Sequence, residues 1–248
     1  MTDAFSFALL LCAIFLMAGA VKGLLGLGLP TVAMGLLGLA MPPVEAAALL
    51  LVPSLVTNLW QLLAGPHFGA LIRRLWPMML AIVVGTLAGS GIIAGAAAHA
   101  ASAGLGAALA LYGVVGLARP RLRVPPAAEP WAGPLVGGLT GVVTGATGVF
   151  VIPAVPYLGS LGLARDDLVQ ALGLSFTIST VALAGGLALH GALPLAASGI
   201  SLLAVLPALA GMWLGGWLRL RVRPETFRLW FFVGLLVLGG ELMWRGLR

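Results

Sequence analysis

Four polar side chains lie on one face of an apolar segment that covers about residues 44–64. Ser54, Thr57, Asn58 and Gln61 follow the spacing i, i+3, i+4, i+7, which puts them on one side of an α-helix. Polar groups in a membrane helix should face protein or water, because lipid tails cannot hydrogen-bond with them. We therefore expect this face to line a substrate site. The alternative is hydrogen bonding between helices, which is worth only about 0.6 kcal/mol per contact on average.

Two glycine-rich segments, each ending in a proline, interrupt the apolar runs at matching positions. The first extends from Gly23 to Pro30, the second extends from Gly141 to Pro153, and the two prolines are 123 residues apart. Glycine allows unusual dihedrals and proline removes a donor, so each segment predicts a broken helix. Such interruptions in both halves of a chain are typical of a transporter's binding site. We expect backbone amides here to bind an anion, with tight helix crossing as the alternative; the glycines concerned are Gly26, Gly28, Gly145 and Gly148.

Lys22 is the only lysine in the chain and directly precedes the first glycine segment. A charge this close to the apolar interior of a membrane is costly, so it needs a reason to be there. Lys22 could attract an anion beside the glycine amides. It could instead mark topology by extending its ammonium to the inner membrane surface. The residue pattern leaves both interpretations open.

The polar face of the first half recurs in the second half. At the same offset of 123 residues, Ser54 and Thr57 correspond to Thr177 and Thr180. A scaffold protein would have no need for this recurrence behind a glycine break, so it favours a binding role. The predicted substrate-binding residues are Lys22, Gly26, Gly28, Ser54, Thr57, Asn58, Gln61, Thr144, Gly145, Thr147, Gly148, Ser175, Thr177 and Thr180.

Two histidines also repeat at the offset of 123, His67 and His190. Histidine titrates near neutral pH, so the pair is a candidate proton relay. No second histidine or carboxylate lies at metal-ligand spacing from either one. We therefore expect no metal site and no cofactor. The alternative to a proton relay is that both histidines are helix-end residues.

The composition identifies an integral membrane protein. Of 248 residues, 61% are hydrophobic and 8% are charged, against roughly 25% charged residues in soluble domains. The net charge of +6 does not indicate nucleic-acid binding, because the arginines gather in short loops between apolar runs. Paired carboxylates, a credible nucleophile and a GxxxxGK[ST] motif are missing, so the sequence predicts neither an enzyme nor an ATP-driven pump. A membrane scaffold or assembly protein remains the alternative to a transporter.

The apolar runs predict about ten helical segments in two halves. We expect an N-terminal repeat at 1–118, a cytoplasmic linker at 119–133 and a C-terminal repeat at 134–248. The runs at 24–41, 134–148 and 149–163 are short for a spanning helix and adjoin the glycine segments. In the C-terminal half we expect one continuous apolar run at 193–218. We also expect that a second copy of the chain is a candidate partner, as in a homodimer.

Arginines mark three loops, at 65–75, in the linker and at 218–224, and all three should face the cytoplasm. Both termini then lie on the outer side of the inner membrane, opposite to the cytoplasm. Equivalent loops of the two halves carry opposite charge character, since loop 65–75 has two arginines and loop 190–193 has none. This predicts an all-α transmembrane bundle of two inverted repeats. Five glycine pairs spaced four residues apart favour close helix packing in lipid: Gly85/Gly89, Gly91/Gly95, Gly137/Gly141, Gly141/Gly145 and Gly211/Gly215.

The order of these motifs resembles the sulfite exporter TauE/SafE family of membrane permeases. The resemblance rests on the glycine segment ending in Pro30, the helix with Ala46 to Thr57, and their repeat at Gly141–Pro153 and Gln170 to Thr180. It implies transport of small sulfur-containing anions, such as sulfite, sulfonates or sulfoacetate, by alternating access between the two repeats. The first motif differs from the family pattern, because Leu27 and Leu29 stand among its glycines.

Overall fold

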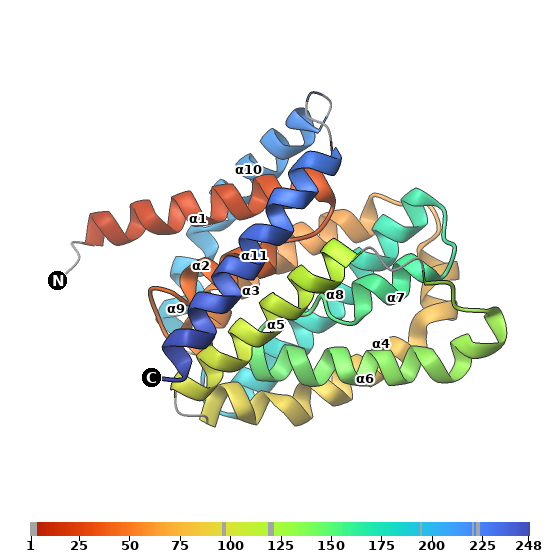
Figure 1. The fold of residues 1–248 in the computed structure, drawn as a ribbon, viewed down its shortest axis with the longest axis horizontal. Coiled ribbons are helices and arrows are strands. Elements are labelled where there is room, and N and C mark those ends of the chain that lie inside the picture. Colours follow the sequence, from red (N-terminus) through yellow and green to blue (C-terminus); the bar gives the residue numbers. More distant parts are fainter. Residues whose placement is uncertain (1–3, 96–97, 119–121, 194, 220, 222–223) are drawn as a thin grey trace.

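The computed structural model describes residues 4–95, 98–118, 122–193, 195–219, 221 and 224–248 (Figure 1). Within these residues it contains eleven α-helices, one short 3-10 helix and no strand, so the predicted all-α class is confirmed. The elements are α1 (Ala4–Leu25), α2 (Leu29–Leu37), α3 (Pro43–Leu63), α4 (Phe68–Gly95), α5 (Ala98–Ala118), η1 (Pro126–Ala128), α6 (Glu129–Thr147), α7 (Ala154–Ser160), α8 (Arg165–Leu189), α9 (Leu195–Leu203), α10 (Val205–Leu218) and α11 (Pro224–Gly246).

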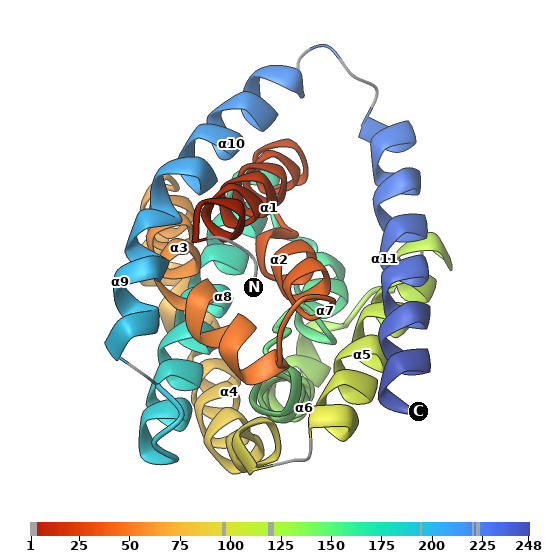
Figure 2. The same ribbon diagram turned by 90° about the vertical axis from the view of Figure 1, so that its left-hand side faces the viewer.

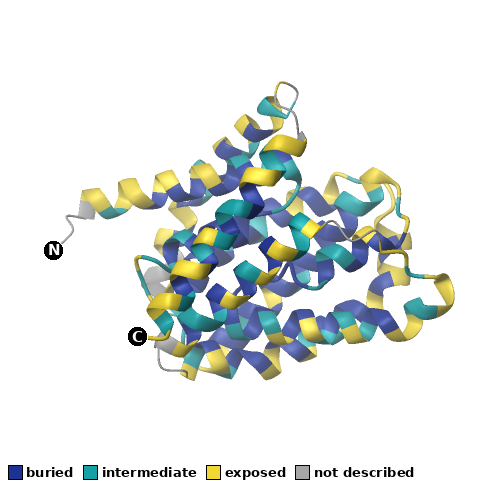
Figure 3. Ribbon diagram, in the orientation of Figure 1, coloured by how far each residue is buried: buried dark blue, intermediate teal, exposed yellow. Residues whose placement is uncertain are grey.

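Seven helical segments of the described chain are long and apolar enough to cross a membrane. Among them, α3 and α8 are the central ones. In the apolar stretch of each of these two helices 67% of the residues are buried, compared with 28% in the segments of α10 and α11. Figure 3 shows the same gradient, with buried residues concentrated inside and exposed ones on the peripheral helices. In Figure 2, α9 and α10 lie on one side of α1 and α2, and α11 lies on the other. The polar stripes predicted on the segments of α3 and α8 are therefore in the interior of the bundle.

Arginines are concentrated at one end of the bundle, where α3, α5, α7 and α10 finish and α4, α6, α8 and α11 begin. We call it the arginine end; those described there are Arg73, Arg74, Arg123, Arg165, Arg219, Arg221 and Arg228. Helix α1 begins and α11 ends toward the left in Figure 1, whereas α6 begins at the far right. The expected loop arginines Arg119, Arg121 and Arg223 lie outside the described residues.

Four helix pairs make the most extensive contacts between the two halves of the chain. Helix α1 packs against α10, α4 against α6, α3 against α8, and α5 against α11. Glycines permit the closest of these approaches: a Cβ added at Gly145 would lie 2.4 Å from the Thr86 carbonyl oxygen, and one at Gly215 would lie 2.0 Å from that of Ala20. The packing role predicted for the spaced glycines is therefore confirmed at Gly85, Gly89, Gly137, Gly141, Gly145, Gly211 and Gly215. It is wrong for the remaining pair, because Gly91 faces only the His190 ring and a Cβ at Gly95 would meet nothing within 4 Å.

Both glycine–proline segments interrupt the helices, as expected. Gly26 and Gly28 adopt positive φ angles of 76° and 107°, and Gly148 adopts 73°, a region that glycine enters without steric cost. Helices α2 and α7 that follow are short, with 9 and 7 residues. The first interruption begins at Gly26, three residues after the start of the glycine segment at Gly23, because α1 continues through Lys22 to Leu25.

Three further expected boundaries are wrong. Helix α4 begins at Phe68, so Arg73 and Arg74 belong to its first two turns and not to a loop. Helix α6 begins at Glu129, because proline is tolerated in a first helical turn and Pro130 does not delay it. The single run expected at 193–218 divides into α9 and α10 at Ala204. Pro207 has no N–H to donate to the carbonyl four residues earlier, which weakens the helix at this point.

Candidate functional site

Lys22 is buried in the interior, with 3% of its surface exposed. Its Nζ donates hydrogen bonds to Asn58 Oδ1 and, over 3.1 Å, to Thr57 Oγ1 of α3. The ammonium therefore points toward the middle of the bundle. The alternative in which Lys22 extends to the membrane surface is not the arrangement seen here.

Asn58 connects the two halves of the chain. Its Nδ2 donates to Thr180 Oγ1 of α8 over 3.2 Å, while its Oδ1 accepts from Lys22. The threonine hydroxyls are held in place by their own helices, since Thr57 Oγ1 donates to the Pro53 carbonyl and Thr180 Oγ1 to the Phe176 carbonyl. A continuous hydrogen-bonded chain thus passes from α1 through α3 to α8. We call Lys22, Thr57, Asn58 and Thr180 the lysine cluster.

Gln61 holds the link between α1 and α2. Its Nε2 lies 3.0 Å from the carbonyl oxygens of both Gly26 and Val169. Its Oε1 is buried without a hydrogen-bond partner among the described residues. Because Gln61 lies one turn beyond Asn58 on the same face of α3, it extends the polar stripe toward the arginine end.

A cavity of about 770 Å³ opens beside the lysine cluster. Lys22, Gly26 and Gln61 contribute polar lining, and Arg219 contributes a second cation near the end of α10. The apolar and small residues that complete the wall are Gly23, Trp60, Ala64, Val169, Leu209, Met212, Trp213, Gly216 and Trp217. A cavity with two cationic residues and largely apolar walls can hold an anion.

The other predicted serines and threonines are buried, but among the described residues none of their hydroxyls hydrogen-bonds with a side chain of the lysine cluster. Ser54 and Ser175 have buried hydroxyls without a partner among the described residues. The hydroxyls of Thr144, Thr147 and Thr177 donate to carbonyls of their own helices, those of Thr140, Val143 and Gly173. Hydroxyls bonded in this way keep lone pairs free to accept a further donor.

The predicted glycines have structural partners of their own. The Gly26 amide donates to the Lys22 carbonyl and the Gly148 amide to the Thr144 carbonyl, each closing the end of a helix. Gly28 precedes α2, and its carbonyl accepts from the Thr31 hydroxyl. Gly145 lies inside α6 and packs against α4. In this structure the amides of Gly26 and Gly148 are thus already bonded within the protein.

The two histidines lie at helix ends, as expected, and far from each other along the bundle. His67 is 61% exposed in its side chain, and its Nδ1 lies 2.7 Å from Asp167 Oδ1. His190 follows α8, and its Nδ1 lies 2.8 Å from the Gly186 carbonyl oxygen. Neither contacts the lysine cluster. Among the residues described, no group of three or more histidine, cysteine or acidic side chains could hold a metal ion.

Two buried polar residues of structural importance were not singled out from the sequence. Gln170 donates to the carbonyls of Leu62 and Gly65 and accepts from the His67 amide, so α8 clamps the turn between α3 and α4. Ser201 of α9 donates to the Leu49 carbonyl and accepts from the Val52 amide, next to Pro53 inside α3. Gln170 lies seven residues before Thr177 on the same helix face, which is the signal that could have indicated it.

Comparison with known proteins gave one clear match. A family model described as "Sulfite exporter TauE/SafE" covers residues 11–242, which is nearly the whole chain. No curated protein and no solved structure matched the chain.

Proposed function

Because this chain belongs to the sulfite exporter TauE/SafE family, we propose that it is a secondary transporter or facilitator of small sulfur-containing anions of the sulfite, sulfonate or sulfoacetate type. The proposal gives the lysine cluster and its cavity the role of the anion site. It treats the protein as a transporter rather than an enzyme, as the family description implies.

The observation that carries the proposal is the buried ammonium of Lys22 among neutral oxygens. Its hydrogen-bond acceptors belong to Thr57 and Asn58, and none of the ion pairs found within the described residues includes it. A buried charge is costly unless it is paired. An anionic substrate that enters the adjoining cavity would supply the missing partner. A single buried ammonium among neutral groups binds an anion less tightly than a cluster of buried cations would, which allows release.

Alternating access between two inverted repeats is the second part of the proposal. The helix pairs support it. If α1 corresponds to α6, α3 to α8, α4 to α10 and α5 to α11, then the α1–α10 pair is equivalent to the α6–α4 pair. The pairs α3–α8 and α5–α11 then each join a helix to its own counterpart. The short helices α2 and α7 stand at the same position in each half. The lysine cluster bridges the central helices of both halves, which is where a site must lie if it is to face each side in turn.

The charge distribution supports an orientation with the arginine end in the cytoplasm and both termini on the outer side of the inner membrane, and the tryptophans support a membrane–water interface at the arginine end. The tryptophans within nine residues of this end of their helices are Trp60, Trp76, Trp131, Trp213, Trp217 and Trp230, and all are exposed. Such residues favour the membrane–water interface. Arg245 and Arg248 at the opposite end are fewer than the arginines at the arginine end.

Flux in proteoliposomes tests the function. Purified protein should move labelled sulfite or a small sulfonate without ATP, and a leucine at Asn58 should abolish binding while circular dichroism stays unchanged. An imposed pH gradient should accumulate the anion if a proton moves with it, whereas a uniporter should respond to voltage alone. Absence of sulfur-anion flux under every gradient would favour the scaffold alternative. Uptake that requires a sodium gradient would contradict both proton-coupled transport and uniport.

A further inference from the structure

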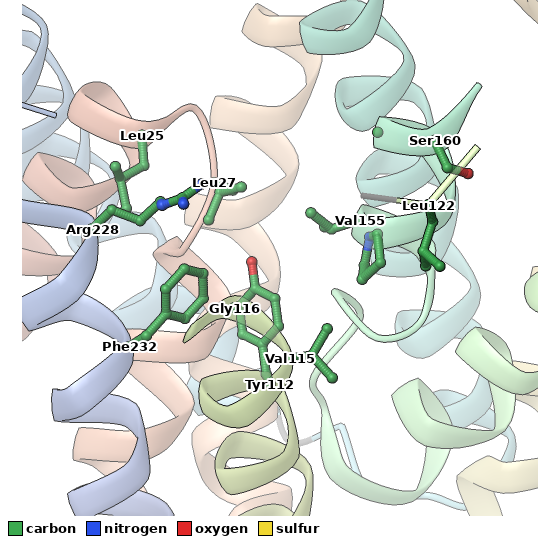
Figure 4. Close-up of a pocket in the computed structure, with 12 residues that line it drawn as sticks. Leu25, Leu27, Tyr112, Val115, Gly116, Leu122, Val155, Ser160, Arg228 and Phe232 are labelled. Atoms are coloured by element: carbon green, nitrogen blue, oxygen red, sulfur yellow. The ribbon is translucent and has the colours of Figure 1, made fainter. Parts of the chain in front are cut away.

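A second cavity, of about 350 Å³, lies at the arginine end on the other side of the α1–α2 link (Figure 4). Leu25 and Leu27 of this link line it, while Gly23 and Gly26 line the cavity beside Lys22. The remaining walls come from the end of α5, from α7, from the start of α11 and from Leu122. Leu122 is 55% exposed, so the mouth of the cavity lies at the protein surface.

Tyr112 presents a buried hydroxyl to this cavity. The residue is 2% exposed, and its hydroxyl has no hydrogen-bond partner within the described chain. Figure 4 shows the hydroxyl pointing into the space between Leu27 and Val155. Buried hydroxyls are almost always satisfied, so an unpartnered one that points into a cavity calls for a partner in that cavity, either water or a ligand.

The orientation of Tyr112 is fixed by aromatic packing. Its ring meets the rings of Phe231 and Phe232 edge-on, with centroids 6.4 and 5.3 Å away. Gly116, one turn further along α5, leaves room for the Phe232 ring, because a Cβ there would lie 2.2 Å from it. The hydroxyl is therefore held toward the cavity before any ligand arrives, which lowers the entropic cost of binding.

Arg228 brings positive charge to the same cavity. It is near the start of α11, and its side chain extends toward Leu25 and Leu27 in Figure 4. At the repeat offset of 123, Arg228 corresponds to Leu105 and Tyr112 to Leu235, and both leucines are buried. The polar pair is therefore not repeated at the equivalent positions of the two halves.

We propose that this cavity binds the phosphate headgroup of an anionic phospholipid from the leaflet at the arginine end. A guanidinium matches the oxygens of a phosphate in a fork geometry, and the tyrosine hydroxyl can donate to a further oxygen. The apolar walls suit the glycerol and the first carbons of the acyl chains. Free phosphate shares the headgroup chemistry and is distinguished by the experiment. The inference does not depend on transport at Lys22, because the two cavities share no lining residue.

Native mass spectrometry of the full-length protein in detergent tests this site. Wild type is titrated with phosphatidylglycerol, phosphatidylcholine and inorganic phosphate, beside Arg228→Gln and Tyr112→Phe. We expect one phosphatidylglycerol to bind more tightly than phosphatidylcholine. Arg228→Gln should weaken it about tenfold or more and Tyr112→Phe about threefold to tenfold, the scale of a lost hydrogen bond to a charged group. Arg165→Gln removes an exposed arginine from the same end and should change nothing.

The outcomes separate the sources of the ligand. Tyr112→Phe keeps the aromatic packing, so weaker lipid binding by a variant with an unchanged unfolding temperature supports the site even if Arg228→Gln folds poorly. Competition by inorganic phosphate would show that the oxyanion alone is recognised. Equal binding of both lipids, or full binding by both variants, would overturn the proposal. Lys22→Met should retain lipid binding. Loss of anion transport can therefore be distinguished from loss of lipid binding.

Discussion

Lys22→Met removes the buried ammonium while keeping an unbranched apolar side chain of similar length. If the ammonium pairs with the transported anion, the variant loses at least one charge-assisted hydrogen bond, worth about 1.5–3 kcal/mol. Each 1.4 kcal/mol corresponds to a tenfold change in affinity, so anion binding should weaken by about 10- to 100-fold. Transport at low substrate concentration should fall by a similar factor.

The same substitution should leave the fold stable. Asn58 Oδ1 loses its donor, which costs about 1–3 kcal/mol for a buried group. Thr57 is less affected, because its hydroxyl still donates to the Pro53 carbonyl. Against these losses, a buried ammonium no longer has to be desolvated, an effect of several kcal/mol in the opposite direction. We therefore expect an unfolding temperature equal to or above that of the wild type.

The assay combines calorimetric anion binding, flux in proteoliposomes and thermal unfolding of the same preparations. Arg165→Gln serves as a control, because it removes one positive charge from an exposed position at the start of α8. Wild-type binding and flux in folded Lys22→Met protein would refute the role given to the ammonium. A collapse of stability together with activity would instead mean that Lys22 is mainly structural.

Two further predictions concern the framework. Gly145→Ala should destabilise the protein by about 1–3 kcal/mol, because its Cβ would lie 2.4 Å from the Thr86 carbonyl oxygen. Thermal unfolding should show no loss for Gly138→Ala on the same helix, where a Cβ meets nothing within 4 Å, and equal losses in both variants would contradict the packing argument. A second test replaces His67 or His190 with cysteine in a background without the native cysteine. If the repeats are inverted, the two cysteines should react with an impermeant thiol reagent from opposite sides of sealed vesicles. Labelling of both from the same side would exclude inversion.

The polar stripe was predictable because it depends only on local geometry. An apolar helix with a period of 3.6 residues puts Ser54, Thr57, Asn58 and Gln61 on one face, and all four are buried. The breaks at Gly26–Gly28 and Gly148 were predictable for the same reason, since they follow from what glycine and proline allow the backbone to do. Boundaries such as the start of α6 were less predictable, because a proline in a first turn is compatible with both loop and helix.

The roles of Gln170 and Ser201 were not predictable from local pattern. Gln170 reaches carbonyls more than 100 residues earlier in the chain, and Ser201 bonds α3 across about 150 residues. A single polar residue in an apolar helix does not reveal which distant backbone group it satisfies. Only the packing of α8 and α9 beside α3 provides those partners.

The sequence by itself determined a membrane protein of apolar helices and the residues whose side chains are polar within them. The tertiary structure decided what Lys22 does. Its surface and interior interpretations were equal by sequence, because a lysine near a helix end can bend its long chain either way. The choice depends on α1 continuing past Lys22 and on α3 crossing it so that Asn58, 36 residues later, accepts a hydrogen bond from the ammonium. Contacts of this kind arise from how closely helix backbones approach, which is a property of the packed bundle and not of any one segment.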